Sequence, residues 1–219
     1  MDPAVFVRRN TAIVAPPMVP EIRLHLATEV TPIWQATEES LARSALPPPF
    51  WAFAWAGGQA LARYLLDHPA EVAGRFVLDF GSGSGLVAIA AAKAGARFVL
   101  AAEIDHFAAA AIAANAALNH VAIVVATVDV IDAADGRWQL VTAGDVCYER
   151  EMADRVVPWL RRLAGHGCLV LLGDPGRAYL PQAGLRERAR YTVPTSLDLE
   201  DRESRDGIVW EVMADRGPS

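Results

Sequence analysis

The chain has 219 residues, of which 53% are hydrophobic and 21% charged, and its formal net charge is −6. This length accommodates one domain with an extension and a sizeable core. The acidic balance, without a run of lysine or arginine, argues against a nucleic-acid partner bound through its phosphates. Cys147 and Cys168 lack the spacing of a metal site or a disulfide framework. The first ten residues lack a signal-peptide pattern, and charges interrupt the alanine-rich segments too often for them to span a bilayer. We therefore expect a cytoplasmic protein without a metal and without a membrane partner.

The N-terminal part of the chain has a mixed character. Residues 22–26 alternate like a strand, and residues 38–43 are patterned like a short helix. We predict an N-terminal extension over residues 1–46 and a single domain over residues 47–219. The domain begins with three prolines, then an aromatic and glycine-rich segment, then a helical stripe over residues 60–66.

From residue 75 onward, strand-like and helix-like segments alternate. The predicted strands are 76–80, 98–102, 121–127, 140–144 and 168–172, and the predicted helices are 86–94, 106–118 and 149–163. This order is typical of an α/β fold with a doubly wound, mostly parallel sheet and right-handed crossovers. Two more strand-like segments, 191–195 and 208–213, flank a charged stretch, and we predict that they close the sheet with at least one antiparallel strand.

A turn with alternating glycines follows the first of these strands. Glycines at a strand-to-helix turn let the backbone approach a ligand, although a tight turn alone is the alternative. The dinucleotide fingerprint requires a third glycine where Leu86 stands, and the Asp79 carboxylate would repel a pyrophosphate. S-adenosylmethionine carries an ammonium, a sulfonium, a ribose and an adenine but no phosphate, so it is the predicted cofactor. The residues assigned to it in this turn are Asp79, Gly81, Ser82, Gly83 and Gly85.

Four further residues are predicted to line the cofactor site. Glu103 and Ile104 follow the next strand, where a carboxylate can accept both ribose hydroxyls. Asp129 follows the third strand and can accept from the adenine amino group, with a solvated loop aspartate as the alternative. Trp55 precedes two glycines that indicate a close approach, and we predict that it lines the cofactor pocket rather than the core.

The fourth and fifth strands end in residues suited to holding an acceptor. Asp145 can orient the ammonium of a lysine while water takes its proton and Tyr148 or an indole shields the site, and an N-cap aspartate followed by a packing tyrosine is the alternative. Asp174 and Arg177 lie in a segment that forms either a simple turn or the substrate side of the crevice. We predict catalytic roles for Asp145 and Tyr148, a cofactor contact for Asp145 as well, and substrate binding for Asp174 and Arg177.

Four segments carry a resemblance to a known family: residues 50–66, residues 77–85, Gly144 to Tyr148, and Gly173 to Arg177. In this order they resemble the lysine methyltransferases of the electron transfer flavoprotein beta subunit, including bacterial relatives, over residues 45–215. The resemblance implies the seven-stranded class I methyltransferase fold, S-adenosylmethionine as donor, and a D-x-x-Y motif at Asp145 and Tyr148. It also implies a bacterial enzyme that modifies lysines of folded proteins, with the electron transfer flavoprotein beta subunit as substrate and a ribosomal protein as a further one.

The chain departs from the family pattern at two positions, and two other functions stay open. Glu103 stands where many relatives carry Asp, and Gln139 stands where Asp is usual, which weakens one expected polar contact. The acceptor can instead be a small molecule under a lid formed by the N-terminal extension. A non-catalytic binding module on the same scaffold is the other alternative.

Overall fold

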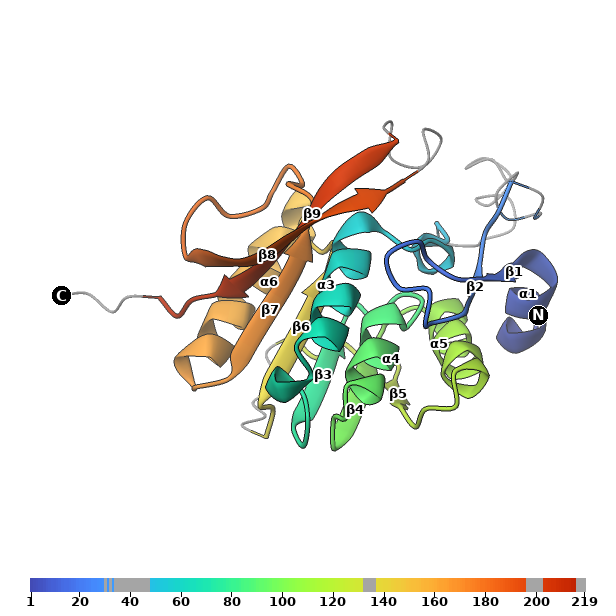
Figure 1. Ribbon diagram of the computed structural model, residues 1–219, viewed down its shortest axis with the longest axis horizontal. Coiled ribbons are helices and arrows are strands. Elements are labelled where there is room, and N and C mark those ends of the chain that lie inside the picture. The colour runs from blue at the N-terminus through green and yellow to red at the C-terminus, as the bar shows by residue number, and fades with distance from the viewer. Residues whose placement is uncertain (30, 32, 34–47, 132–136, 196–202, 216–219) are drawn as a thin grey trace.

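The computed structural model describes residues 1–29, 31, 33, 48–131, 137–195 and 203–215 (Figure 1). A seven-stranded sheet has the order β5-β4-β3-β6-β7-β9-β8. Its strands are β3 (Phe76–Phe80), β4 (Phe98–Ala102), β5 (Val124–Ala126), β6 (Leu140–Gly144), β7 (Leu169–Asp174), β8 (Leu185–Pro194) and β9 (Ser204–Val212). The pairs from β5 to β7 are parallel, whereas β9 is antiparallel to both of its neighbours. The predicted fold class, with its antiparallel closing strand, is confirmed.

Helices cover both faces of the sheet. The helices after residue 48 are α3 (Ala56–Asp67), α4 (Leu86–Lys93), α5 (His106–Leu118) and α6 (Arg150–Gly165), with short 3-10 turns η1 (Phe50–Ala52) and η2 (Pro69–Glu71). Successive strand side chains point to opposite faces, so Val77 packs with α3 and α4 while Leu78 packs with α6. Helix α4 is apolar on nearly every side because it is buried, whereas α6 has one apolar stripe.

The N-terminal extension packs into the main core. Helix α1 (Pro3–Asn10) contacts α5, and strands β1 (Ala12–Val14) and β2 (Leu24–Leu26) form an antiparallel hairpin. Asn115 of α5 accepts from the backbone N–H of His25 at 2.7 Å, and Leu24 belongs to the same core as α3 and α4. The sequence pattern did not predict α1 or β1, and the predicted helix over 38–43 lies outside the described residues.

Two strands differ from their predicted bounds in a way that matters for the site. Strand β5 is shorter than predicted, and β7 continues beyond residue 172 because Gly173 and Asp174 pair with Val209 and Ile208 of β9. That pairing brings Asp174 into the sheet, where its side chain is fully buried. Sequence periodicity carries no information about partners 34 and 36 residues away, so the sequence predicts a strand that ends at residue 172.

Candidate functional site

The glycine turn lies between β3 and α4, as predicted. Gly81, Gly83 and Gly85 have φ values of +59°, +53° and +82°, a left-handed backbone that glycine adopts without strain. A Cβ on Gly85 would also lie 3.2 Å from Ile112 of α5. The glycines therefore allow the turn itself and bring α4 close to α5.

Asp79 lies beneath this turn and is 1% exposed. Its Oδ2 accepts from the Ser82 hydroxyl at 2.5 Å, and its Oδ1 accepts from the Thr142 hydroxyl at 2.8 Å. Burial raises the pKa of the carboxyl to about 6, against the opposing effect of these two hydrogen bonds. The carboxylate thus braces the turn against β6, while its predicted contact with an ammonium group stays a prediction. Thr142 was missed, although it is the one hydroxyl in an otherwise apolar strand.

Glu103 joins the glycine turn to the end of β4. Its Oε2 accepts from the backbone N–H of Gly83 at 3.0 Å, and its Oε1 accepts from those of Ile104 and Asp105 at 2.8 and 3.2 Å. Ile104 is 66% exposed beside it, which is unusual for a large aliphatic side chain. The Glu103 carboxylate can accept from a diol, and Ile104 offers an apolar surface for an adenine. Because the turn also lacks lysine and arginine, the site fits a nucleoside ligand without phosphate.

Asp129 lies at the surface after β5 and is held by its own partners. Its Oδ2 accepts from Arg155 of α6 at 2.7 Å, and its Oδ1 accepts from the backbone N–H of Ile131 at 3.0 Å. Hydrogen bonds from Arg155 and from this N–H hold the pKa of the carboxyl below its usual value. This geometry resembles the solvated-loop alternative, and the adenine contact stays a prediction.

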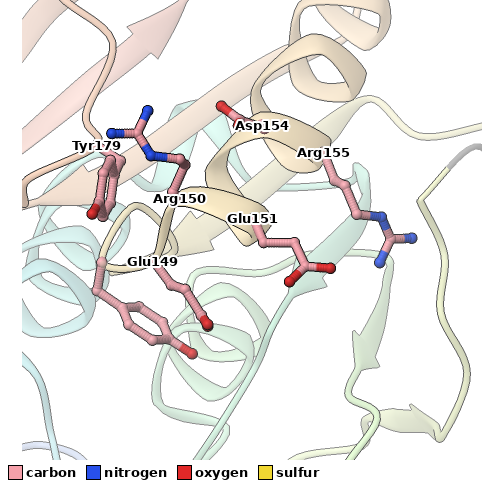
Figure 2. Close-up of a pocket in the computed structure, with 7 residues that line it drawn as sticks. Glu149, Arg150, Glu151, Asp154, Arg155 and Tyr179 are labelled. Carbon is pink, nitrogen blue, oxygen red and sulfur yellow. The ribbon is translucent and has the colours of Figure 1, made fainter.

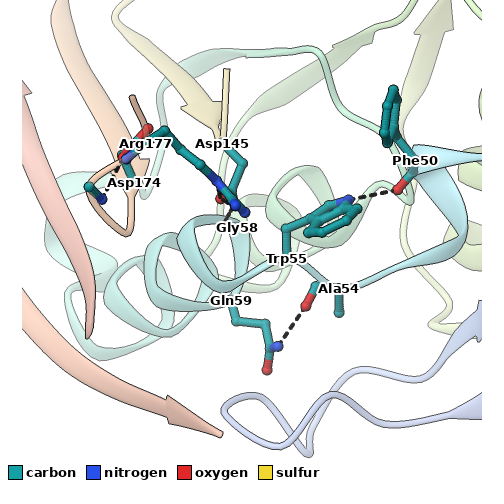
Figure 3. A network of polar contacts seen from close by, with 9 residues as sticks. Phe50, Ala54, Trp55, Gly58, Gln59, Asp145, Asp174 and Arg177 are labelled. Atoms are coloured by element: carbon teal, nitrogen blue, oxygen red, sulfur yellow. Dashed lines mark hydrogen bonds and ion pairs between the residues drawn. The ribbon is translucent and has the colours of Figure 1, made fainter. Parts of the chain in front are cut away.

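Asp145 sits at the carboxyl end of β6 with φ +55°, a left-handed conformation that few residues other than glycine adopt. Its Oδ2 accepts from the backbone N–H of Gly58 at 2.8 Å, and its Oδ1 accepts from Nε and Nη2 of Arg177 at 3.2 and 2.9 Å (Figure 3). Burial raises the pKa of this carboxyl to about 6, although the Arg177 charge acts to lower it.

The same carboxylate caps a helix from outside. The N-cap residue of α3, Trp55, makes no capping hydrogen bond with its side chain, and Asp145 satisfies the N–H of Gly58 instead. The sequence allowed Asp145 to be the N-cap of the helix that follows it. Asp145 instead caps α3, because α6 begins only at Arg150.

Glycine contacts bring α3 against the ends of β6 and β7. A Cβ on Gly57 would lie 2.7 Å from Oδ2 of Asp145, and a Cβ on Gly173 would overlap the carbonyl oxygen of Gly57. A Cβ on Gly144 would lie 3.1 Å from the Cα of Gly58. The close approach predicted beside Trp55 is thus an approach of the helix to two strands.

Trp55 and the segment after β7 complete this group. The Trp55 indole donates to the Phe50 carbonyl at 2.9 Å, and the Arg177 guanidinium lies 5.5 Å from the indole centroid (Figure 3). Oδ1 of Asp174 accepts from the backbone N–H groups of Gly176 and Arg177, both at 2.7 Å. The predicted turn forms, and it brings the Arg177 side chain to Asp145. We call Trp55, Asp145, Asp174 and Arg177 the Asp145 cluster.

Tyr148 is on the surface, 42% exposed, with its ring centre 5.5 Å from that of Phe50. The D-x-x-Y motif therefore has a buried carboxylate and an exposed phenol. Next to the phenol, an open pocket of about 650 Å³ lies over the first turns of α6 (Figure 2). Its lining residues are Tyr148, Glu149, Arg150, Glu151, Asp154, Arg155 and Tyr179. Except for Tyr148, none of the predicted site residues lines it.

Gln139, one of the two departures from the family pattern, has a structural partner. Its Oε1 accepts from the backbone N–H of Phe76 at 3.1 Å, at the start of β3. The amide therefore links β3 to the segment before β6, and a polar contact exists at this position.

Comparisons with known proteins decide the family. Residues 60–146 match the family model described as ribosomal protein L11 methyltransferase (PrmA). Over 214 residues the chain is 39% identical to the electron transfer flavoprotein beta subunit lysine methyltransferase of Xenopus laevis, covering 95% of this chain and 86% of that protein. The chain belongs to this family. It is a methyltransferase, so the predicted family and enzyme class are confirmed, and a bacterial origin stays a prediction.

Two solved structures agree with the class I fold. The ribosomal protein L11 methylase of Lactobacillus delbrueckii subsp. bulgaricus matches with a TM-score of 0.51 and 23% identity, over 74% of this chain and 81% of that chain. The magnesium protoporphyrin IX methyltransferase of Synechocystis PCC 6803, a structure with bound SAM, matches with a TM-score of 0.54 and 17% identity, over 73% and 80%.

Proposed function

We propose that this chain transfers a methyl group from S-adenosylmethionine to a lysine of the electron transfer flavoprotein beta subunit. The observation that carries the proposal is that the glycine turn and Asp145 lie next to each other at the same edge of the sheet. Strands β3 and β6 are parallel neighbours, so the glycine turn and Asp145 lie side by side at their carboxyl ends. A Cβ on Gly81 would lie 3.6 Å from Val146, the residue after Asp145. Ligands of open α/β sheets bind at this edge.

The donor side is suited to S-adenosylmethionine, which supplies an electrophilic methyl group on a sulfonium when bound. Glu103 would accept from the ribose hydroxyls, and Ile104 would offer an apolar surface to the adenine. Asp129 would accept from the adenine amino group, and Trp55 would line the same pocket. The bound SAM in the Synechocystis relative of this fold supports the same cofactor here.

The acceptor side orients an amine. A carboxylate offers about four lone-pair positions, and three protein donors already occupy positions on Asp145, which leaves one for an N–H of the lysine. Tyr148 covers the amine from solvent. Positioning supplies most of the rate, with about 7–11 kcal/mol available from this source. A lysine with a pKa of about 10.4 must first lose a proton to water, at a cost of about 4–5 kcal/mol at pH 7.

A ribosomal protein is the second candidate substrate. The match of residues 60–146 to the ribosomal protein L11 methyltransferase model supports it.

We also propose that the enzyme acts in the cytoplasm of a bacterium. Within the described ranges, the longest apolar helices fall short of what a membrane span requires, and no group of His, Cys, Asp and Glu residues there is arranged to hold a metal.

Transfer of radiolabel from S-adenosylmethionine tests the function. Purified electron transfer flavoprotein beta subunit, ribosomal protein L11 and a small-molecule extract are each offered as acceptors. We expect label on the first protein, with loss of at least 100-fold in Asp145→Asn and cofactor affinity within about tenfold. Asp154→Asn, an exposed carboxylate on α6, serves as the matched control.

Other outcomes contradict the proposal in defined ways. Label confined to small molecules identifies a small-molecule methyltransferase. Cofactor binding without transfer to any acceptor identifies a non-catalytic module.

A further inference from the structure

The Arg177 guanidinium occupies a position suited to a substrate ammonium. It contacts the Asp145 carboxylate at 2.9 Å and lies over the Trp55 ring at 5.5 Å (Figure 3). The two partners of this ion pair are 17% and 8% exposed. A carboxylate and an aromatic face are the groups that attract an alkylammonium ion. A fixed cation of the protein is therefore already present where lysine must approach.

Methyl transfer requires a lysine without its proton, because the nitrogen lone pair forms the new N–C bond as the C–S bond breaks. A carboxylate without a counter-ion would stabilise the ammonium form and raise the pKa of the lysine. It would then bind the substrate in its unreactive state. An arginine keeps its proton at all relevant pH values, so it can offset that carboxylate permanently.

We propose that Arg177 is a positioning residue that neutralises Asp145, so that the acceptor lysine binds as the uncharged, reactive amine. This inference rests on the proposed function and assigns Arg177 a role other than direct substrate anchoring. Asp145 retains one acceptor position for an N–H of the amine, and Arg177 removes the electrostatic preference for a protonated one.

The charges around Asp145 give the direction of the effect. Among the described residues, the charges that act on Asp145 are those of Arg177 and Asp174, from β7 and the loop after it. Cys147 is next to the same two carboxylates, whereas Glu149 and Glu103 act on Tyr148. Helix α3 contributes the N–H of Gly58. Burial raises the pKa of Cys147 to about 12 and also raises that of Tyr148, so both stay neutral near pH 7.

Within the part of the chain that the structure describes, the buried carboxyls of Asp145 and Asp174 and the partly buried Arg177 guanidinium sum to a formal charge of −1. Without Arg177 the charge would be −2, and every proton nearby would bind more tightly. The direction is the same whether the extra proton is held by Asp145 or by the lysine. On the acid side of the pH profile, kcat rises as the essential proton is lost, and we call this part of the profile the acid limb. The acid limb therefore moves to higher pH when Arg177 is replaced by an uncharged residue.

The test is the dependence of kcat on pH, because its limbs report groups of the enzyme–substrate complex. Wild type, Arg177→Met and Arg177→Lys are compared with saturating S-adenosylmethionine and electron transfer flavoprotein beta subunit. We expect the acid limb of Arg177→Met to rise by one to three pH units, the usual effect of one nearby charge. Arg177→Lys should stay within about half a unit, because it keeps the charge.

Asp174→Asn gives an independent test of the opposite sign. It removes one negative charge and retains an amide oxygen for the N–H groups of Gly176 and Arg177. We expect its acid limb to move to lower pH. The affinity for S-adenosylmethionine, measured by calorimetry, should stay within about threefold in all variants, which shows that the donor side is folded.

A uniform loss of kcat with an unmoved acid limb in Arg177→Met would overturn the inference and leave Arg177 with a packing role only. An Asp174→Asn limb that moves upward would overturn it as well, even where Arg177→Met fails to fold. If wild type binds the cofactor but methylates the acceptor at no pH, the proposed function fails, and this inference fails with it.

Discussion

The proposed donor and acceptor sides of the site are built in different ways. On the donor side, the glycine turn and Glu103 are consecutive in the β3–α4–β4 unit, and their polar contacts are mostly with backbone N–H groups nearby in the sequence. On the acceptor side, Trp55, Asp145 and Arg177 come from three segments that glycine contacts bring together. A local motif can form a cofactor cradle, whereas the acceptor position depends on how helix α3 packs on two strands.

The largest effect should come from breaking that packing. Gly173→Ala places a Cβ on the carbonyl oxygen of Gly57, and backbone on both sides leaves little room for adjustment. We expect a loss of about 3 kcal/mol in the free energy of unfolding, at the upper end of overpacking effects, together with loss of methyl transfer. Urea unfolding and the radiolabel assay measure the two effects.

Gly165→Ala at the end of α6 is the matched control, because its Cβ would meet only the Ala214 Cβ at 3.8 Å. It should be neutral or stabilising by less than about 1 kcal/mol. A Gly173→Ala protein with wild-type stability and activity would show that the acceptor side does not depend on this contact.

A smaller effect is expected in the pH dependence of stability. The folded-state pKa of Asp79 is about 6, above its ordinary value of 3.8, so the native state binds this proton more tightly than the unfolded chain does. Its contribution to stability is therefore present below about pH 4 and is lost as pH rises through 6, by about 2–3 kcal/mol in total. Asp79→Asn should flatten this decline, as measured by urea unfolding between pH 4 and 8.

Asp129→Asn should change the pH dependence of stability in the direction opposite to that of Asp79→Asn. Arg155 lowers the pKa of Asp129, so its small contribution is present above the unfolded pKa and is lost on acidification. Because both partners are about half exposed, we expect this contribution to the free energy of unfolding to be less than about 1 kcal/mol.

The Asp79 prediction has its own contrary outcome. If the slope of the unfolding free energy against pH is unchanged in Asp79→Asn, the Asp79 carboxyl titrates as in the unfolded chain.

A change at the donor side should separate cofactor binding from the chemical step. Glu103→Gln can keep an oxygen for the N–H groups of Ile104 and Asp105, but it places an amide NH2 against the N–H of Gly83 and weakens a ribose contact. We expect about tenfold weaker binding of S-adenosylmethionine, about 1.4 kcal/mol, with kcat at saturation little changed. Glu149→Gln in the surface pocket is the control. A fall in kcat without a change in affinity would place Glu103 on the acceptor side.

The donor side was largely predictable because its residues follow local rules. Glycines that require a positive φ and a carboxylate after a buried strand leave a direct trace in the sequence, and Gly81, Gly83 and Glu103 lie where they were expected. The bracing contacts of Asp79 were less visible. They depend on Thr142, which is 63 residues away and belongs to a neighbouring strand.

By itself the sequence determined the order of strands and helices from residue 75 onward, the glycine turn and the family, because periodicity and local backbone requirements act over short distances. Only the tertiary structure decided that Asp145 caps α3, that Arg177 pairs with it, and that Asp174 lies inside the sheet. The physical reason is that partners of buried charges are selected by packing, and packing brings together residues separated by 30 to 90 positions.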